Sequence, residues 1–202
     1  MSPVPQLPPS SPDSELVGHA ALIGRSADAF PADRSTGADE VATDRLRRAR
    51  LVRIEEIDPA RPQAQFCLRE YFTELAQRFS AGFDPASSIS AEPGDMRPPR
   101  GMFLIAILSG EPVGCGALKF HGDQPTELKR LWVSPNARGL GIGRRLLTEL
   151  ERRAAGSGSR VIHLETNETL TEAIAMYRAA GYREVDPFND EPHATHWFEK
   201  TV

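Results

Sequence analysis

The sequence has few cysteines and no long apolar run. Only Cys67 and Cys115 are present, and they do not form a C-x-x-C motif, so we expect two free thiols in a reducing, cytoplasmic compartment. No stretch approaches the roughly 18 consecutive apolar residues that a membrane-spanning helix needs. The first residues, MSPVPQLPPSSPDSE, have neither the basic nor the apolar region of a secretory signal. These absences predict a protein without a membrane partner.

An excess of positive charge is also missing. The formal net charge is −4 at pH 7, which argues against a nucleic-acid partner and is compatible with a cationic substrate. The spacing of His163, His193 and His196 does not match a set of metal ligands, so we expect no metal. His196 could line an acceptor pocket, or it could simply contact a neighbouring strand.

Apolar residues are scarce near the beginning of the chain. Five prolines occur within the first twelve residues, and Gly, Ser, Ala and Asp dominate the residues after them. Such a segment buries too little surface to offset the entropy lost on ordering, so we predict a disordered extension over residues 1–48. Residues 44–50 form a short basic run, which is either an anion or partner contact or a solvated helix or linker. Residues 51–202 are enough for one domain.

The stretch from Glu127 to Glu151 organises that domain. It reads as a strand, a turn, a glycine-rich loop over residues 138–143 and an amphipathic helix. The first amides of a helix lack intrahelical partners, and the helix dipole places partial positive charge there. The glycines remove the β-carbons that would keep an anion away. Together with the positive charges of Arg138 and Arg144, the loop is predicted to bind a phosphate or a pyrophosphate.

The spacing of the glycines excludes two common phosphate-binding motifs. The dinucleotide fingerprint would require a glycine at residue 144, where an arginine stands, and the nucleoside-triphosphate loop requires a lysine that is absent. The pattern R-x-x-G-x-G from Arg138 to Gly143 instead resembles the pyrophosphate-binding motif of the GNAT superfamily, the acyl-CoA-dependent N-acyltransferases. A second segment, A-x-x-x-Y-x-x-x-G-Y from Ala173 to Tyr182, resembles another motif of that family. The resemblance extends from about residue 51 to about residue 200.

The resemblance implies a fold, a cosubstrate and a set of binding residues. The fold is α/β, a single domain in which helices flank a mixed, mostly antiparallel sheet of about six to seven strands. The implied cosubstrate is acetyl-CoA, whose pantetheine would pair with a strand edge. The cofactor-binding positions correspond here to Leu131, Trp132, Val133, Arg138, Gly139, Leu140, Gly141, Ile142, Gly143, Arg144, Asn167 and Tyr177.

The implied reaction is direct attack of a primary amine on a thioester, which requires a base for the ammonium and an acid for the leaving thiolate. In the family the tyrosine of the second motif lies near the sulfur of the carrier, so Tyr177 is the candidate acid; a core tyrosine is the structural alternative. Glu127 matches the glutamate base of histone-acetylating members, and an exposed strand-end carboxylate is its alternative. The amide of Val133 could polarise the thioester carbonyl.

The acceptor is an amine on a small molecule or a peptide, and the sequence does not identify it. A cluster of acidic residues near the last strands hints at a cationic amine: Asp186, Asp190 and Glu191. In the family the loop over residues 80–100 borders the acceptor cleft, homodimers are common, and residues 188–200 resemble a bacterial subgroup. The alternative function is a non-catalytic acyl-CoA-binding module.

Local signals also place the individual elements. Asp58-Pro59 predicts the start of a helix that ends near Phe79, and the capping-box spacing of Thr169 and Glu172 predicts a helix that begins near Leu170. Periodicity predicts strands at 51–57, 102–108, 113–120, 127–133, 161–166, 182–185 and 194–200.

Overall fold

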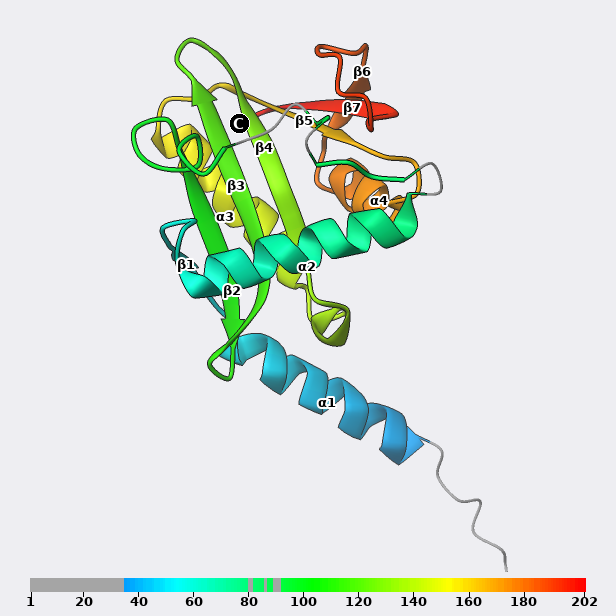
Figure 1. The fold of residues 1–202 in the computed structure, drawn as a ribbon. Helices are drawn as coiled ribbons and strands as arrows, with labels where there is room; N and C mark the ends of the chain where they lie inside the picture. Colours follow the sequence, from blue (N-terminus) through cyan, green and yellow to red (C-terminus); the bar gives the residue numbers. More distant parts are fainter. Residues whose placement is uncertain (1–34, 80–81, 86, 89–91) are drawn as a thin grey trace, which may run out of the picture. The chain divides into compact units, whose positions relative to one another are not determined.

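The computed structural model describes residues 35–202, except for residues 80–81, 86 and 89–91. The segment Ser35–Leu51 forms helix α1 (Figure 1). This corrects the predicted boundary of the extension, because residues 35–48 are helical; their alanines, arginines and leucine are good helix formers. Residues 1–34 lie outside the described part. The basic run of residues 44–50 lies within α1, so it is helical and not a linker.

Seven strands form one sheet in the order β1-β2-β3-β4-β5-β7-β6. Their bounds are Arg53–Glu56 (β1), Gly101–Leu108 (β2), Glu111–His121 (β3), Gln124–Val133 (β4), Val161–Thr166 (β5), Arg183–Val185 (β6) and His196–Thr201 (β7). Neighbouring strands are antiparallel except for β4 and β5, which are parallel. The prediction of a mixed, mostly antiparallel α/β sheet is confirmed.

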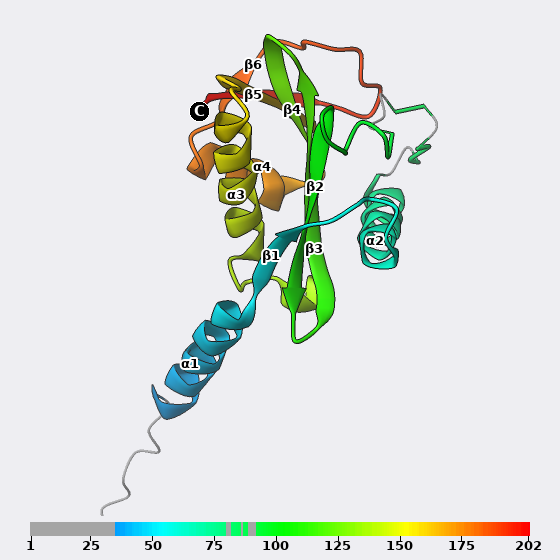
Figure 2. The same ribbon diagram turned by 90° about the vertical axis from the view of Figure 1, so that its left-hand side faces the viewer.

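Helices cover both faces of the sheet. Helix α2 (Pro62–Arg78) lies on one face and α3 (Ile142–Gly156) on the other, as the view in Figure 2 shows. All eight residues of β2 are buried. Alternate side chains of β2 belong to two separate clusters, Leu104 to the one with α3 and Ile105 to the one with α2. A strand covered on both faces is apolar throughout, which explains the run MFLIAIL.

Helix α2 begins later than the local signal indicated. Its first residue is Pro62 and its N-cap is Arg61, whereas the sequence predicted a start at Pro59. Asp58 Oδ1 accepts a hydrogen bond from the amide of Ala60 at 2.8 Å. The aspartate therefore closes a turn before the helix instead of capping it.

Helix α4 (Thr171–Ala179) also differs in detail from its prediction. Its N-cap is Leu170, without a side-chain cap bond, so the predicted capping box does not form. Gly181 follows the helix with a φ of 88°, the left-handed conformation expected of a glycine at this place.

Strand β4 carries a bulge in the middle of the sheet. Cys115 and Ala117 of β3 pair with Trp132 and Lys129 of β4, so one residue of β3 lies opposite two of β4. One of these two is Arg130, whose backbone is left-handed with a φ of 59°. The bulge redirects the side chains and the main chain of the strand that leads into the glycine-rich loop.

The other edge of β4 is paired over a short distance. Its ladder with β5 comprises Thr126 with Ile162 and Glu127 with His163. The described part of β4 beyond Glu127 has no such pairing with β5. Within it, the carbonyl oxygen of Val133 accepts a hydrogen bond from Arg138 Nε at 3.2 Å.

Two further findings concern the described residues alone. None of their helices is both long enough and apolar enough to cross a lipid bilayer. Cys67 and Cys115 are free thiols, and both are completely buried.

Candidate active site

The glycine-rich loop borders a cavity of about 580 Å³, which we call the α3 cavity. Gly139 and Gly141 have left-handed backbones with φ values of 78° and 73°, and Gly141 is the N-cap of α3. A β-carbon added to Gly143 would stand 3.2 Å from the sulfur of Met176 on α4. Backbone conformation therefore favours glycine at two positions and close helix packing favours it at the third.

Most of the predicted cofactor-binding residues line this cavity: Leu131, Trp132, Val133, Arg138, Gly139, Gly141, Ile142, Gly143, Arg144 and Tyr177. Leu140 does not, because its side chain is buried in the core that packs against α3. Asn167 lines a different cavity, described below. The α3 cavity also receives side chains from α2, a helix that the sequence predicted only as core packing.

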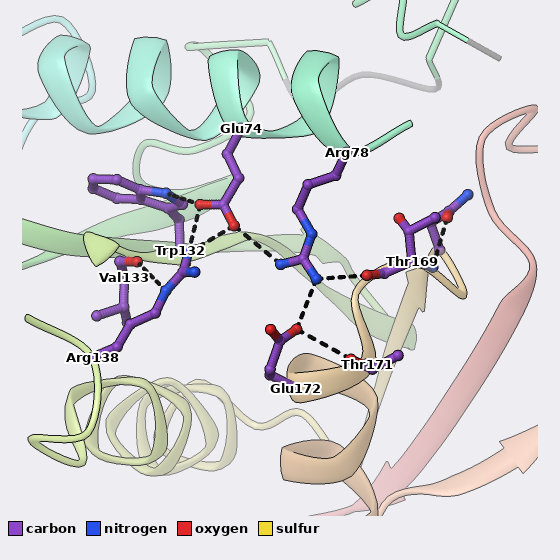
Figure 3. Close-up of polar contacts among 9 residues, drawn as sticks. Glu74, Arg78, Trp132, Val133, Arg138, Thr169, Thr171 and Glu172 are labelled. Atoms are coloured by element: carbon purple, nitrogen blue, oxygen red, sulfur yellow. Dashed lines mark hydrogen bonds and ion pairs between the residues drawn. The ribbon is translucent and has the colours of Figure 1, made fainter. Parts of the chain in front are cut away.

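A network of charged side chains from three elements lines the α3 cavity (Figure 3). Arg138 Nη2 donates to both carboxylate oxygens of Glu74, at 2.7 and 2.6 Å, and Trp132 Nε1 donates to the same carboxylate at 2.9 Å. Arg78 links Glu74 to Glu172 of α4, with N–O distances of 3.2 and 2.8 Å. Arg138, predicted as a free positive charge, is thus paired with a carboxylate that local sequence signals did not reveal.

These contacts stabilise the ionised form of the Glu74 carboxyl group. Burial opposes its ionisation, but the hydrogen bonds from Arg138 and Arg78 outweigh burial and lower the pKa of the Glu74 carboxyl. Arg144, the other predicted cation, is exposed and lines the same cavity.

Helix α1 reaches the glycine-rich loop. A β-carbon added to Gly139 would stand 2.5 Å from Nη2 of Arg45, so the Arg45 guanidinium lies against the main chain of Gly139. Arg145 of α3 donates to the carbonyl oxygens of Ala49 and Val52, at 2.7 and 2.9 Å. These bonds tie the last turn of α1 and the residue that follows it to α3.

A second cavity, of about 90 Å³, lies at the end of β5, and we call it the β5 cavity. Six residues line both cavities: Tyr71, Leu75, Leu131, Leu170, Ala173 and Tyr177. The two cavities therefore meet between α2, β4 and α4.

Tyr177 stands at this junction. It lies on α4, is 6% exposed, and its ring contacts those of Tyr182 and Phe198, with centroid distances of 5.8 and 6.1 Å. Burial raises the pKa of the Tyr177 hydroxyl, and the nearby charge of Glu165 acts in the same direction. The tyrosine is thus both packed in the core and placed at the wall of both cavities.

Glu127, the predicted base, lies on β4 but lines neither cavity. Its carboxylate is 3.0 Å from Lys129 Nζ and 3.4 Å from His121 Nε2. Lys129, whose side chain is 7% exposed, also pairs with Glu165. Burial opposes the charge of Lys129, but the two carboxylates outweigh it and raise the pKa of its ammonium group.

Glu165 was not identified from the sequence, although it lines the β5 cavity. Its Oε1 pairs with Lys129, and its Oε2 is buried and has no hydrogen-bond partner among the described residues. The wall of the β5 cavity thus includes a carboxylate with one unpaired oxygen, which is covered from water.

Asn167 follows β5 and lines the β5 cavity rather than the α3 cavity. Its Nδ2 donates to the carbonyl of His193 at 2.8 Å, and its Oδ1 accepts from the amide of Thr169 at 3.0 Å. The side chain therefore holds the loop before β7 against the start of the segment that leads to α4.

The acidic residues near the last strands separate in the structure. Glu191 lines the β5 cavity, whereas Asp186 and Asp190 line neither cavity. His196 also lines neither; its Nδ1 is 2.5 Å from Glu184 Oε1, as in the alternative of a contact with a neighbouring strand. Within the described ranges, no group of three or more His, Cys, Asp or Glu side chains is arranged to hold a metal ion.

Known proteins share this sequence and fold. Residues 67–182 match the acetyltransferase (GNAT) family. The IAA acetyltransferase of Azospirillum brasilense is 42% identical over 87 residues, which cover 43% of this chain and 57% of that protein, less than two thirds of its length. The N-alpha-acetyltransferase RimI of Mycobacterium tuberculosis is 32% identical over 128 residues, which cover 62% of this chain and 75% of that protein.

A solved structure supports the same assignment at the level of the fold. The GNAT-family acetyltransferase of Staphylococcus aureus superimposes with a TM-score of 0.63 at 20% identity, and the alignment covers 74% of this chain and 98% of that one. The matched residues include β4, the glycine-rich loop, α3, and α4 with Tyr177. The chain therefore belongs to the acetyltransferase (GNAT) family.

Proposed function

We propose that the protein transfers an acetyl group from acetyl-CoA to a primary amine. The observation that carries the proposal is the junction of two cavities at Tyr177, one leading to the glycine-rich loop and the other to a buried carboxylate. A linear thioester in the first cavity and an amine in the second would meet at this junction.

The α3 cavity fits the carrier in its chemistry. At the loop, the first amides of α3 and the glycine main chain can bind a diphosphate, and a β-carbon on Gly141 would point into open space rather than into protein. The edge of β4 from Leu131 to Val133 can pair with the amide groups of pantetheine. The amide of Val133 is the proposed donor to the thioester carbonyl.

Tyr177 is the proposed acid for the leaving thiolate. Its hydroxyl is protonated at neutral pH, as that of an ordinary tyrosine with a pKa of about 10 is, and can donate. Burial raises the pKa of Tyr177, which makes it a weaker acid and favours the return of a proton to it after the transfer. The thioester sulfur would lie at the wall that this tyrosine shares between the two cavities.

Two carboxylates are candidates for the base. The cavity geometry favours Glu165, because it lines the β5 cavity, where an amine would enter, and its Oε2 has no hydrogen-bond partner among the described residues. Glu127 lies behind Lys129, which contacts both carboxylates, so we propose that Glu127 supports the base by fixing this ammonium group. A direct role of Glu127 through a water molecule is the competing assignment.

Thiol release from acetyl-CoA with a panel of amines tests the function. We expect Tyr177→Phe and Glu165→Gln each to lower kcat by about 10²-fold and to spare the KM for acetyl-CoA, as for loss of a proton-transfer group. Glu127→Gln should have a smaller effect if Glu165 is the base, and a larger one if the assignments are reversed. Coenzyme A binding without turnover of any amine would support a non-catalytic acyl-CoA-binding module instead.

A further inference from the structure

Arg130 occupies a position that its backbone does not favour. It lies in the bulge of β4 with a φ of 59°, a left-handed conformation that glycine and asparagine adopt more readily. Backbone strain of this kind concentrates at sites where the orientation of a side chain matters. The bulge directs Arg130 to the β5 cavity, which it lines.

The guanidinium group of Arg130 is positioned by aromatic rings, but no carboxylate of the described residues forms an ion pair with it. It lies over the rings of Phe72 and Tyr71, with distances of 4.7 and 5.6 Å to the centroids, so α2 fixes its plane. Its Nε is buried without a hydrogen-bond partner. Among the residues that the structure describes, no Asp or Glu forms an ion pair with it. A partly buried cation of this kind is stabilised when an anion binds beside it.

The same cavity contains a second unsatisfied group of opposite charge. Glu165 lines the cavity; its Oε2 is buried and has no hydrogen-bond partner among the described residues, while its Oε1 is bound by Lys129. A guanidinium group forms charge-assisted hydrogen bonds with a carboxylate, and a carboxylate accepts hydrogen bonds from an amine. The cavity has a volume of about 90 Å³, so a carboxylate and an amine that both bind there must lie close together in the ligand.

We infer that the amine acceptor carries a carboxylate close to its amine, and that it is a small amino acid. Arg130 binds the carboxylate, and Glu165 contacts the amine that attacks the thioester. This inference rests on the proposed acetyl transfer and specifies its substrate class. It makes Arg130 a specificity-determining residue rather than a participant in proton transfer.

Matched acceptor pairs test the inference. Each pair is a free amino acid and its primary amide, which differ in the negative charge, and kcat/KM is measured for both with saturating acetyl-CoA. The wild-type protein should prefer the acid over the amide by about tenfold to a hundredfold, the range of a charge-assisted hydrogen bond. Arg130→Gln should abolish this preference by lowering kcat/KM for the acids while leaving the amides nearly unchanged. Arg130→Lys should restore part of it, because the positive charge remains.

A matched control separates the cavity from general charge effects. Arg53→Gln removes an exposed cation from β1 and should leave the acid-to-amide ratio at the wild-type value. Thermal unfolding of each variant verifies that it is folded. Equal use of acids and amides by the wild-type protein, or equal losses for both in Arg130→Gln, would overturn the inference and leave acetyl transfer standing. Failure of all amines, with coenzyme A still bound, would overturn the proposed function together with it.

Discussion

Lys129 holds two carboxylates together inside the sheet. Its side chain is 7% exposed and contacts Glu127 and Glu165, and Glu165 lines the β5 cavity. A buried cation between two anions is costly to remove, because each anion then lacks its partner.

We therefore expect Lys129→Met to destabilise the fold by about 3–5 kcal/mol near neutral pH, the range for breaking a buried ion pair. Urea unfolding of the variant and of the wild-type protein measures this loss. A loss of less than about 1 kcal/mol, the range of an exposed ion pair, would contradict this account of the cluster.

The sequence revealed Tyr177 but not Glu165, and the reason is physical. Tyr177 lies in a motif whose spacing can be recognised. Glu165 is one of the alternating residues of β5, whose other face carries the buried Ile162 and Leu164. The alternation shows that Glu165 faces away from that core, but which cavity lies on its face depends on how α2 and β4 are arranged. Glu74 is hidden for the same reason, since its partner Arg138 is distant in sequence.

At the scale of elements, two roles of the glycine before α3 can be separated: the backbone conformation that it adopts and the ligand that it is proposed to bind. Gly141 has a φ of 73° at the N-cap of α3, and Gly158 has a φ of 90° in the turn that follows the helix. An added β-carbon would meet nothing within 4 Å at either position. The two glycines therefore impose a similar backbone requirement at opposite ends of one helix.

Alanine at either position should cost about 1–2 kcal/mol of stability, the penalty of a left-handed conformation for a residue with a β-carbon. Only Gly141→Ala should also weaken acetyl-CoA binding, because its β-carbon would enter the space where the diphosphate is proposed to lie. Calorimetry with coenzyme A and thermal unfolding give the two readouts. Equal affinities in the two variants would place the diphosphate elsewhere.

The first residue of α2 could not be predicted from local sequence alone. The sequence favours Pro59 over Pro62, because Asp58 is a preferred N-cap residue and Arg61 is not. The choice of Pro62 depends on the turn closed by Asp58, whose carboxylate is also bound by Arg97 at 2.6 Å from a distant loop. The apolar face of α2 was predictable, whereas its first residue depended on a tertiary contact.

For the molecule as a whole, the three tyrosines differ in exposure: Tyr177 and Tyr182 are buried, whereas Tyr71 is half-buried at the wall of both cavities. Burial raises the pKa of Tyr71, Tyr177 and Tyr182 above the ordinary value of about 10. Above that pH the folded state holds more protons than the unfolded state, so stability falls as the pH rises through about 10. The chain contains no other tyrosine.

An alkaline titration followed by tyrosinate absorbance should therefore show little signal near pH 10 (about the ordinary tyrosine value) while the protein is folded. The absorbance should rise together with the loss of structure measured by circular dichroism. Ionisation of a tyrosine at its ordinary pKa in the folded protein would contradict the burial of that residue.

The overall sheet was predictable because its strands carry their own patterns. The continuous apolar run of β2 and the alternation of β5 report whether one or both faces are covered. The placement of β7 between β5 and β6 was not predictable, because it depends on pairing between segments that are distant in sequence. The short ladder between β4 and β5 was not predictable for the same reason.

The attachment of α1 is a further property of the whole described unit. Arg145→Gln should remove the two bonds to Ala49 and Val52 and speed hydrogen exchange of the α1 amides. Arg152→Gln, which removes a cation from the same helix that pairs only with Glu149 among the described residues, serves as the control. Equal exchange rates in both variants would show that other contacts hold α1.

The contact between Arg45 and Gly139 has a practical consequence. Any molecule that settles on the loop changes the electrostatic surroundings of α1, although α1 itself contributes nothing to the wall of the α3 cavity. Leu46, next to Arg45, is 64% exposed and can carry a fluorescent dye without disturbing the core. Such a dye would serve as an optical reporter of ligand occupancy in a protein whose cavity-lining residues all remain native.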